Sequence, residues 1–241
     1  MIFEYPTIDI ITNELKLKDN LFNQNNLNEI FSYQKSKKLK DSCIFLEKSD
    51  LQFSLKGNDL WGLDLPVRIS NGNFNKTIVF LGQDPLRKSE DYLGIKNKIV
   101  VSLPFAVNCE QKFKKEIQYL IEYICDRGDS IYFTDIFKIY TGENLNTKKY
   151  KDIKNINVSI IKKELDMIKP DIIIASGKVA QEFIKNENIN ICKIIEIPHY
   201  TAAACNTKKS FEELPGFNTK ANEKFNFKKF EYLKNLIEKN I

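Results

Sequence analysis

The chain of 241 residues is long enough to bury one large core, and its apolar content of 42% is typical of a globular protein. Its net charge of +5 is a mild excess, which argues against a protein dedicated to wrapping a polyanion. The five cysteines are odd in number and form no C-x-x-C pair, which argues against a disulfide framework and a local zinc site.

The amino-terminal segment carries acidic residues early and has no basic-then-apolar signal pattern. No run approaches the roughly 18 apolar residues that a membrane span needs. We therefore expect a soluble, cytoplasmic protein, associated with the nucleoid if its host is bacterial. The polar composition of residues 1–70 predicts a helical or irregular extension. The turn residues in 60–75 predict an irregular segment that leads into the core.

Four apolar runs bounded by turn signals predict buried strands, and they cover 77–82, 130–135, 171–176 and 191–198. Helical periodicity lies between them, most clearly in 110–129 and 155–170. Strands that are apolar throughout and alternate with helices indicate a parallel sheet covered on both faces. The prediction is a doubly wound α/β fold with a central parallel four-stranded sheet, in a single domain over 1–241 whose core spans 71–241.

A last helix is predicted near the carboxyl terminus. Four apolar residues there share one helical face, which is more typical of core packing than of a partner surface: Phe227, Phe230, Leu233 and Ile237.

Polar residues follow the predicted strands. Asp84 comes after the first strand, Asp135 ends the second, and His199, the single histidine, follows the fourth. Ligands of open parallel sheets bind beyond the carboxyl ends of the strands, so these residues are predicted to share one crevice. Each also has a structural explanation, as a turn residue, a cap or a hydrogen-bonded core histidine. Their coincidence at one edge favours a function.

The segment SGKVAQ does not have the spacing of a phosphate-binding loop. Gly177 and Lys178 are therefore expected to begin a helix.

Three motifs together resemble the uracil-DNA glycosylase superfamily. They are GQDP directly after the first core strand, ASGKVAQEF in the third strand–helix unit, and a late IPHYT, in the family's order over 77–205. YFTDIFK is similar to the T-N-x-x-K segment of some branches, with Asp135 at the asparagine position.

The resemblance implies roles for individual residues. Asp84 would orient or deprotonate the attacking water, and Pro85 would restrict its backbone. His199 would donate a hydrogen bond to O2 of a base flipped out of the stack, and Phe105 would stack on that base, unless Phe105 is a core residue. No metal or nucleotide cofactor is implied.

The resemblance also implies contacts to the base and to phosphate groups. The implied base contacts are Gln83, Leu86, Phe105 and Asp135. The implied phosphate contacts are Arg87, Lys88, Lys178 and Thr201. Lys138 and Lys208 complete a predicted basic rim, although each of its members is also explained as a solvated side chain.

The motifs depart from the family pattern at several positions. Leu86 and Arg87 replace the tyrosine and histidine after GQDP, and Tyr200 with Thr201 replaces Pro-Ser in the late motif. An ionised Asp135 offers acceptors only, and opposite uracil O4 this mismatch costs about 1–3 kcal/mol. Asp135 is then protonated, or the pose differs, or the preferred base is not plain uracil.

The expected function is a monomeric DNA glycosylase that hydrolyses the N-glycosidic bond of uracil or a related base in DNA. Two alternatives remain. One is a non-catalytic protein of the same fold that binds modified DNA, and the other is an unrelated α/β hydrolase of free nucleosides or nucleotides.

Overall fold

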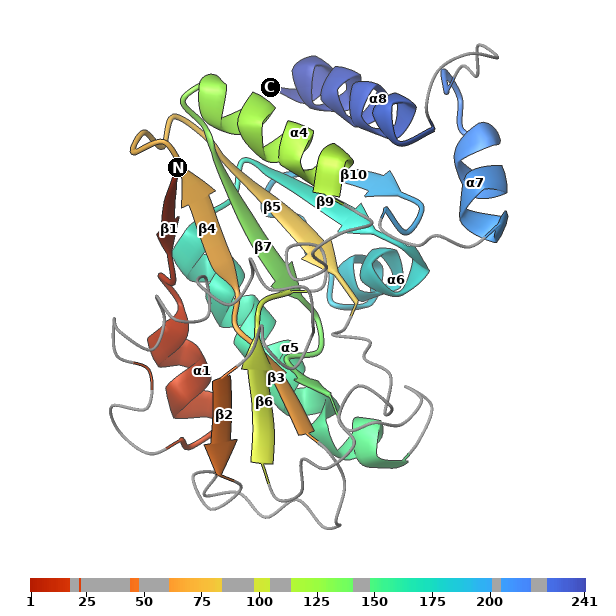
Figure 1. Ribbon diagram of the computed structural model, residues 1–241. Helices are drawn as coiled ribbons and strands as arrows, with labels where there is room; N and C mark the ends of the chain where they lie inside the picture. Colours follow the sequence, from red (N-terminus) through yellow and green to blue (C-terminus); the bar gives the residue numbers. More distant parts are fainter. Residues whose placement is uncertain are drawn as a thin grey trace.

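The structure is a computed structural model that describes residues 1–17, 22, 44–47, 61–83, 98–104, 114–140, 148–200, 205–217 and 225–241. Its main feature is a sheet of six strands in the order β1-β4-β7-β5-β9-β10 (Figure 1). The central part is parallel and contains β7 (Ser130–Asp135), β5 (Thr77–Gly82), β9 (Ile172–Ser176) and β10 (Lys193–Ile197). These are the four strands predicted from the apolar runs.

Two further strands extend the sheet at one edge and make it mixed. β4 (Val67–Ser70) pairs antiparallel with β7, and β1 (Ile2–Glu4) pairs antiparallel with β4. The sheet is therefore wider than the four strands expected, because β4 pairs with the free side of β7 and β1 in turn pairs with β4.

Helices cover both faces of the sheet, as a doubly wound fold requires (Figure 1). α4 (Lys114–Asp126) and α8 (Phe225–Asn240) lie on one face, and α5 (Lys148–Ile168) and α6 (Lys178–Asn186) on the other. α1 (Ile8–Glu14) packs on α5, and α7 (Cys205–Glu212) precedes α8. None of the helices in the described ranges is long and apolar enough to cross a membrane.

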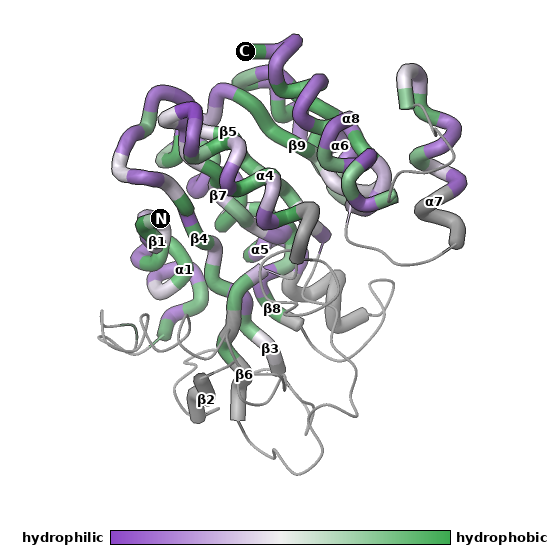
Figure 2. Tube along the Cα trace, turned by 45° about the horizontal axis from the view of Figure 1, so that its top comes forward, coloured by the Kyte–Doolittle hydropathy of each residue, from purple (hydrophilic) through white to green (hydrophobic). Residues whose placement is uncertain are grey.

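The inner strands are largely apolar because each face of the sheet has its own core, whereas the edge strand β10 carries the exposed Lys193 and Glu196. Ile78 and Phe80 point to the face of α4 and α8, whereas Val79 and Leu81 point to that of α5 and α6. Successive side chains of a strand alternate between faces, so a strand covered on both sides has apolar residues at most successive positions. Figure 2 shows this as a hydrophobic run along β9.

A second sheet corrects the prediction for residues 60–75. Its order is β2-β6-β3-β8, formed by β2 (Ile44–Glu47), β6 (Lys98–Ser102), β3 (Trp61–Asp64) and β8 (Ile139–Tyr140). Figure 1 shows it beyond the carboxyl ends of β5 and β7. The expected irregular lead-in instead supplies β3 and β4. Both strands are four residues long and are separated by Pro66, so their pairing partners, distant in the chain, decide their conformation.

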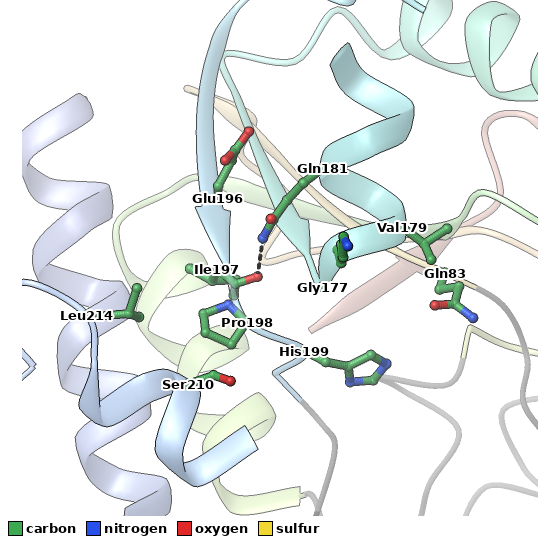
Figure 3. A pocket seen from close by; sticks show the side chains of 11 residues that line it. Gln83, Gly177, Val179, Gln181, Glu196, Ile197, Pro198, His199, Ser210 and Leu214 are labelled. Atoms are coloured by element: carbon green, nitrogen blue, oxygen red, sulfur yellow. Dashed lines mark hydrogen bonds between the residues drawn. The ribbon is translucent and has the colours of Figure 1, made fainter. Parts of the chain in front are cut away.

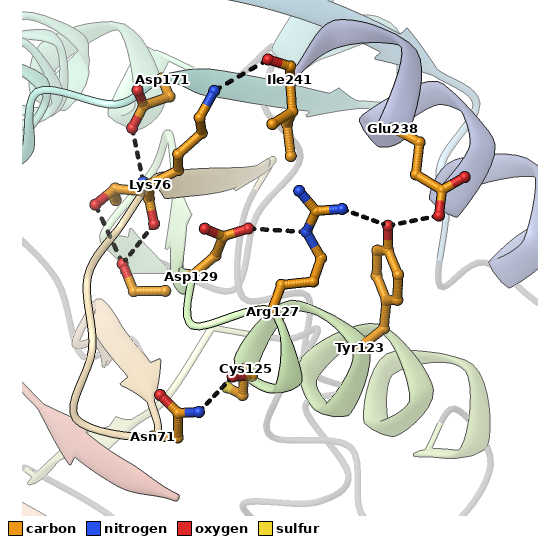
Figure 4. A network of polar contacts seen from close by, with 11 residues as sticks. Asn71, Lys76, Tyr123, Cys125, Arg127, Asp129, Asp171, Glu238 and Ile241 are labelled. Carbon is orange, nitrogen blue, oxygen red and sulfur yellow. Dashed lines mark hydrogen bonds and ion pairs between the residues drawn. The ribbon is translucent and has the colours of Figure 1, made fainter.

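The opposite end of the parallel strands is closed by a polar network (Figure 4). Nε of Arg127 lies 3.0 Å from Oδ2 of Asp129. Nη1 of Arg127 donates to the hydroxyl of Tyr123, and this hydroxyl donates to Glu238 on α8. Asp171 accepts a hydrogen bond from the backbone N–H of Thr77 at 2.8 Å. Each of these charged groups has a hydrogen-bond or ion-pair partner within the network, which gives the network a structural role.

Candidate active site

The end of β5 lies against the end of β7, and a glycine makes this approach possible. Gly82 and Asp135 are registered partners, and a Cβ added at Gly82 would collide with Oδ1 of Asp135. Asp135 is only 4% exposed. The carbonyl of Gln83, the next residue, accepts a hydrogen bond from the N–H of Phe137 at 3.0 Å. Backbone bonds thus fix the first residue after β5, the one that directly precedes Asp84.

The end of β9 lies against the segment that follows β10. Gly177 has a φ of +90°, and a Cβ there would lie 3.3 Å from Cδ2 of His199. The N–H of Tyr200 donates to the hydroxyl of Ser176 at 2.9 Å, and the N–H of Gly177 donates to the carbonyl of Ile197 at 2.9 Å. Residues with a Cβ rarely adopt the backbone conformation of Gly177. The absence of a Cβ at this position also allows the imidazole of His199 to pack on the turn.

A cavity of about 620 Å³ joins these two strand ends. Figure 3 shows His199 and Gln83 on its wall, with Gln181 donating to the carbonyl of Ile197 at 2.7 Å. The described lining residues come from the ends of β5, β9 and β10 and from α6 and α7: Gln83, Gly177, Lys178, Val179, Gln181, Glu196, Ile197, Pro198, His199, Ser210 and Leu214. Asp135 is not among them.

His199 is half-buried, and its surroundings favour the neutral imidazole. Burial lowers the pKa of His199, a backbone hydrogen bond opposes this, and the positive charge of Lys229 lowers the pKa further. A neutral imidazole carries one N–H donor and one acceptor. Near neutral pH this side chain is therefore a hydrogen-bond donor without a full charge.

Lys138 does not belong to a basic rim, which corrects that prediction. Its side chain is 1% exposed, and Nζ lies 2.9 Å from Oε2 of Glu164 on α5. Lys138 also donates to the hydroxyl of Thr134, which donates to the same carboxylate oxygen at 2.8 Å. Burial raises the pKa of Glu164, and the charge of Lys138 opposes that rise. The residue predicted to be a solvated neighbour of Asp135 is thus an internal anchor of the segment after β7.

The other predicted residues divide into described and undescribed ones. Lys178 begins α6 after Gly177, as expected, and its side chain is 86% exposed, with Nζ 3.6 Å from Glu182. Several predicted site residues lie outside the described residues: Asp84, Leu86, Arg87, Lys88, Phe105 and Thr201. The side chain of Lys208 is also outside them.

Cavity-lining residues from α7, together with Lys229 beside His199, were not predicted. Ser210 and Leu214 line the cavity from the α7 side, and Lys229 reaches the residue after His199 from α8. No motif marks these positions, because they lie on or just after helices whose sequences read as ordinary amphipathic surface. Within the described ranges, no group of three or more His, Cys, Asp or Glu side chains is arranged to hold a metal ion.

Comparison with protein families identifies the fold. The family model of the uracil DNA glycosylase superfamily matches residues 69–226, which includes every strand of the parallel part of the sheet and the cavity at its carboxyl ends. The chain belongs to the uracil DNA glycosylase superfamily. No curated protein sequence matches the chain significantly.

Superfamily membership is in accord with the site as built. The match covers the GQDP and IPHYT motifs, and Gln83 of the first motif and His199 of the second line one cavity. The superfamily consists of glycosylases that act on DNA, so a hydrolase of glycosidic bonds is the general class to which this fold points.

Proposed function

We propose that this protein is a monofunctional DNA glycosylase that hydrolyses the N-glycosidic bond of uracil or a related pyrimidine in DNA. The observation that carries the proposal is the half-buried His199, packed on Gly177 and sharing one cavity with Gln83, the residue before Asp84. This arrangement supports a neutral donor on one wall of the cavity, and Asp84, the candidate carboxylate, is the residue that follows Gln83 in the chain.

In the proposed reaction, the bond between the sugar C1′ and the base nitrogen breaks, and the base leaves with the electron pair. His199 donates a hydrogen bond to O2 of the base, where negative charge accumulates. One preorganised donor of this kind contributes roughly 3–4 kcal/mol in the transition state. Asp84 orients a water molecule whose oxygen bonds to C1′, and the proton released neutralises the departing base.

The neutral state of His199 supports this role. An imidazolium would stabilise the departing anion more strongly by charge, but a buried cation must first be taken out of water. Burial and Lys229 both lower the pKa of His199, so the side chain enters the reaction uncharged. Its donor strength is then set by geometry rather than by solution pH near neutrality.

The substrate is proposed to be wider than plain uracil. Leu86 stands where the family has a tyrosine that excludes a 5-methyl group, so 5-substituted uracils enter the proposed range. The family resemblance assigns Asp135 to the edge of the base, and Asp135 packs on Gly82, which precedes the cavity-lining Gln83 in the chain. An ionised carboxylate offers hydrogen-bond acceptors only. A base that presents a donor there would meet it better than the O4 of uracil.

The test is an abasic-site assay on oligonucleotides that contain uracil, 5-hydroxymethyluracil, mismatched thymine, hypoxanthine or xanthine. We expect release of at least one pyrimidine, reduced on the order of 10²-fold or more by Asp84→Asn and by His199→Ala. Asp9→Asn, an exposed carboxylate in the first turn of α1, is the matched control and should leave the rate unchanged.

Two results would contradict the proposal. Salt-dependent DNA binding without release of any base would favour a binding protein of the same fold. Turnover of free nucleosides with little affinity for DNA would favour the alternative hydrolase.

A further inference from the structure

Lys229 is a buried cation next to the candidate site. It lies on α8, is 2% exposed, and its Nζ donates to the carbonyl of Tyr200 at 2.8 Å. A lysine this deeply buried is uncommon unless its ammonium has specific partners. Tyr200 directly follows His199, so one of these partners belongs to the segment that carries the imidazole.

Aromatic rings surround the Lys229 ammonium. Nζ lies 5.1 Å from the centre of the Tyr200 ring, 5.4 Å from that of Phe225 and 6.0 Å from that of Phe211. The faces of aromatic rings attract cations, more strongly where water is excluded. The rings come from the segment after β10 and from the helices α7 and α8. Lys229 therefore joins these elements behind the cavity.

Tyr200 is held by both of its backbone polar groups. Its N–H donates to Ser176 at the end of β9, and its carbonyl accepts from Lys229. Its ring is fully buried and lies 5.8 Å from the ring of Phe80 on β5. With the residue after it fixed in this way, His199 has little freedom to leave Gly177.

Charge gives Lys229 a second effect. Among the described residues, Lys178 at the start of α6 and Glu196 on β10 line the cavity together with the imidazole, and Lys229 approaches the same segment from α8. Burial lowers the pKa of His199, and the positive charge of Lys229 lowers it further. The cation that fixes the segment also disfavours protonation of the imidazole.

We propose that Lys229 is a positioning residue of the candidate site, which holds the His199–Tyr200 segment and places a fixed positive charge behind the imidazole. The inference rests on the proposed function, in which His199 acts as a neutral donor. Lys229 touches neither base nor sugar in this scheme. It acts entirely through the geometry and the protonation state of His199.

The test follows the titration of His199 by NMR in the full chain, where it is the single histidine. In Lys229→Met we expect the pKa of His199 to rise, because the repelling charge is gone. Lys229→Arg should keep it near the wild-type value. Lys234→Met is the matched control, because Lys234 lies on the same helix but its Nζ is 5.4 Å from the ring of Tyr123.

A second readout separates positioning from simple loss of stability. The acid limb of the pH profile of base release should move to higher pH in Lys229→Met, in step with the histidine titration. A merely destabilised protein would lose activity equally at all pH values. If Lys229→Met does not fold, Lys229→Gln, which keeps a donor for the carbonyl but no charge, replaces it.

An unchanged His199 pKa in the folded uncharged variant, equal to that of Lys234→Met, would overturn the inference. The titration needs no catalysis. A raised pKa in a protein that releases no base would therefore leave the role of Lys229 intact and contradict the proposed function alone.

Discussion

Gly82 and Asp135 form a registered pair at the ends of two parallel strands. The side chain of Asp135 requires a glycine at position 82. The carboxylate of Asp135 occupies the space where a Cβ at position 82 would be. The glycine of GQDP thus has a physical reason that concerns another motif of the chain, YFTDIFK. The two motifs are linked through space.

We expect Gly82→Ala to destabilise the protein by about 1–3 kcal/mol, because the added methyl group displaces the Asp135 side chain in a packed interior. In an Asp135→Ala background the same substitution should cost less than about 0.5 kcal/mol, since the next atom, the carbonyl of Thr134, lies 3.8 Å away. Urea unfolding of the four proteins of this cycle measures the coupling. Additive effects would show that Asp135 is not the obstacle.

At the scale of elements, α4 and α8 form a layer on one face of the sheet. Phe230, Leu233 and Ile237 of α8 are 8%, 1% and 0% exposed, as the predicted stripe requires. Phe227 belongs to the same stripe in the sequence, but it is 43% exposed and contacts Tyr119 near the surface. Phe227 therefore lies at the margin of the buried stripe, in contact with Tyr119 and Phe230.

Truncation of Phe227 and of Phe230 on α8 is therefore predicted to have different costs in stability. Phe230→Ala should reduce the free energy of unfolding by about 3–5 kcal/mol, through lost burial and a residual cavity. Phe227→Ala should reduce it by about 1 kcal/mol or less. Chemical denaturation of both variants under identical conditions makes the comparison. Equal losses would show that α8 is rotated relative to the arrangement described.

At the scale of the whole molecule, the two ends of the parallel sheet have different roles. The amino ends are closed by the ion pair of Arg127 with Asp129 and by the hydrogen bond from the N–H of Thr77 to Asp171. The carboxyl ends carry the cavity, the half-buried His199 and the second sheet. Parallel strands place their loops at one edge, so the residues of several motifs meet there although they are far apart in the chain.

The lowered pKa of His199 also predicts a dependence of stability on pH. The unfolded chain takes up the proton first as the pH falls below the ordinary value of about 6.5, so the folded state loses stability from there down to its own lower pKa. Above that window the stabilisation is complete. We expect wild-type protein to lose more stability than His199→Gln between pH 7.5 and 5.5, measured by urea unfolding.

Glu164 also contributes to the pH dependence of stability that this measurement follows. Burial raises its pKa, so its contribution has the opposite sign and falls as pH rises. Glu164 is present in both proteins, and the difference between them removes its contribution. Equal pH dependence of wild type and His199→Gln would contradict the lowered pKa.

Much of this protein follows from local patterns in the sequence. The four parallel strands were predictable because burial on both faces leaves runs without polar positions, and α4, α5 and α8 because one helical face is apolar. The GQDP and IPHYT motifs at the strand ends marked Gln83 and His199, which line one cavity. These features depend on residues close together in the chain.

Other features were decided by tertiary structure alone. β3 and β4 exist through their pairing partners, and Lys138 and Lys229 are buried because Glu164 and the Tyr200 carbonyl lie within reach of their ammonium groups. From the sequence alone, a lysine near other polar residues is expected to be solvated. The partners of Lys138 and Lys229 lie 26 and 29 residues away in the chain, so local patterns do not indicate them. Local patterns in the sequence determine the layers of the fold and the motif residues at the strand ends. The burial of Lys138 and Lys229 depends on the tertiary structure, because their partners come from other elements.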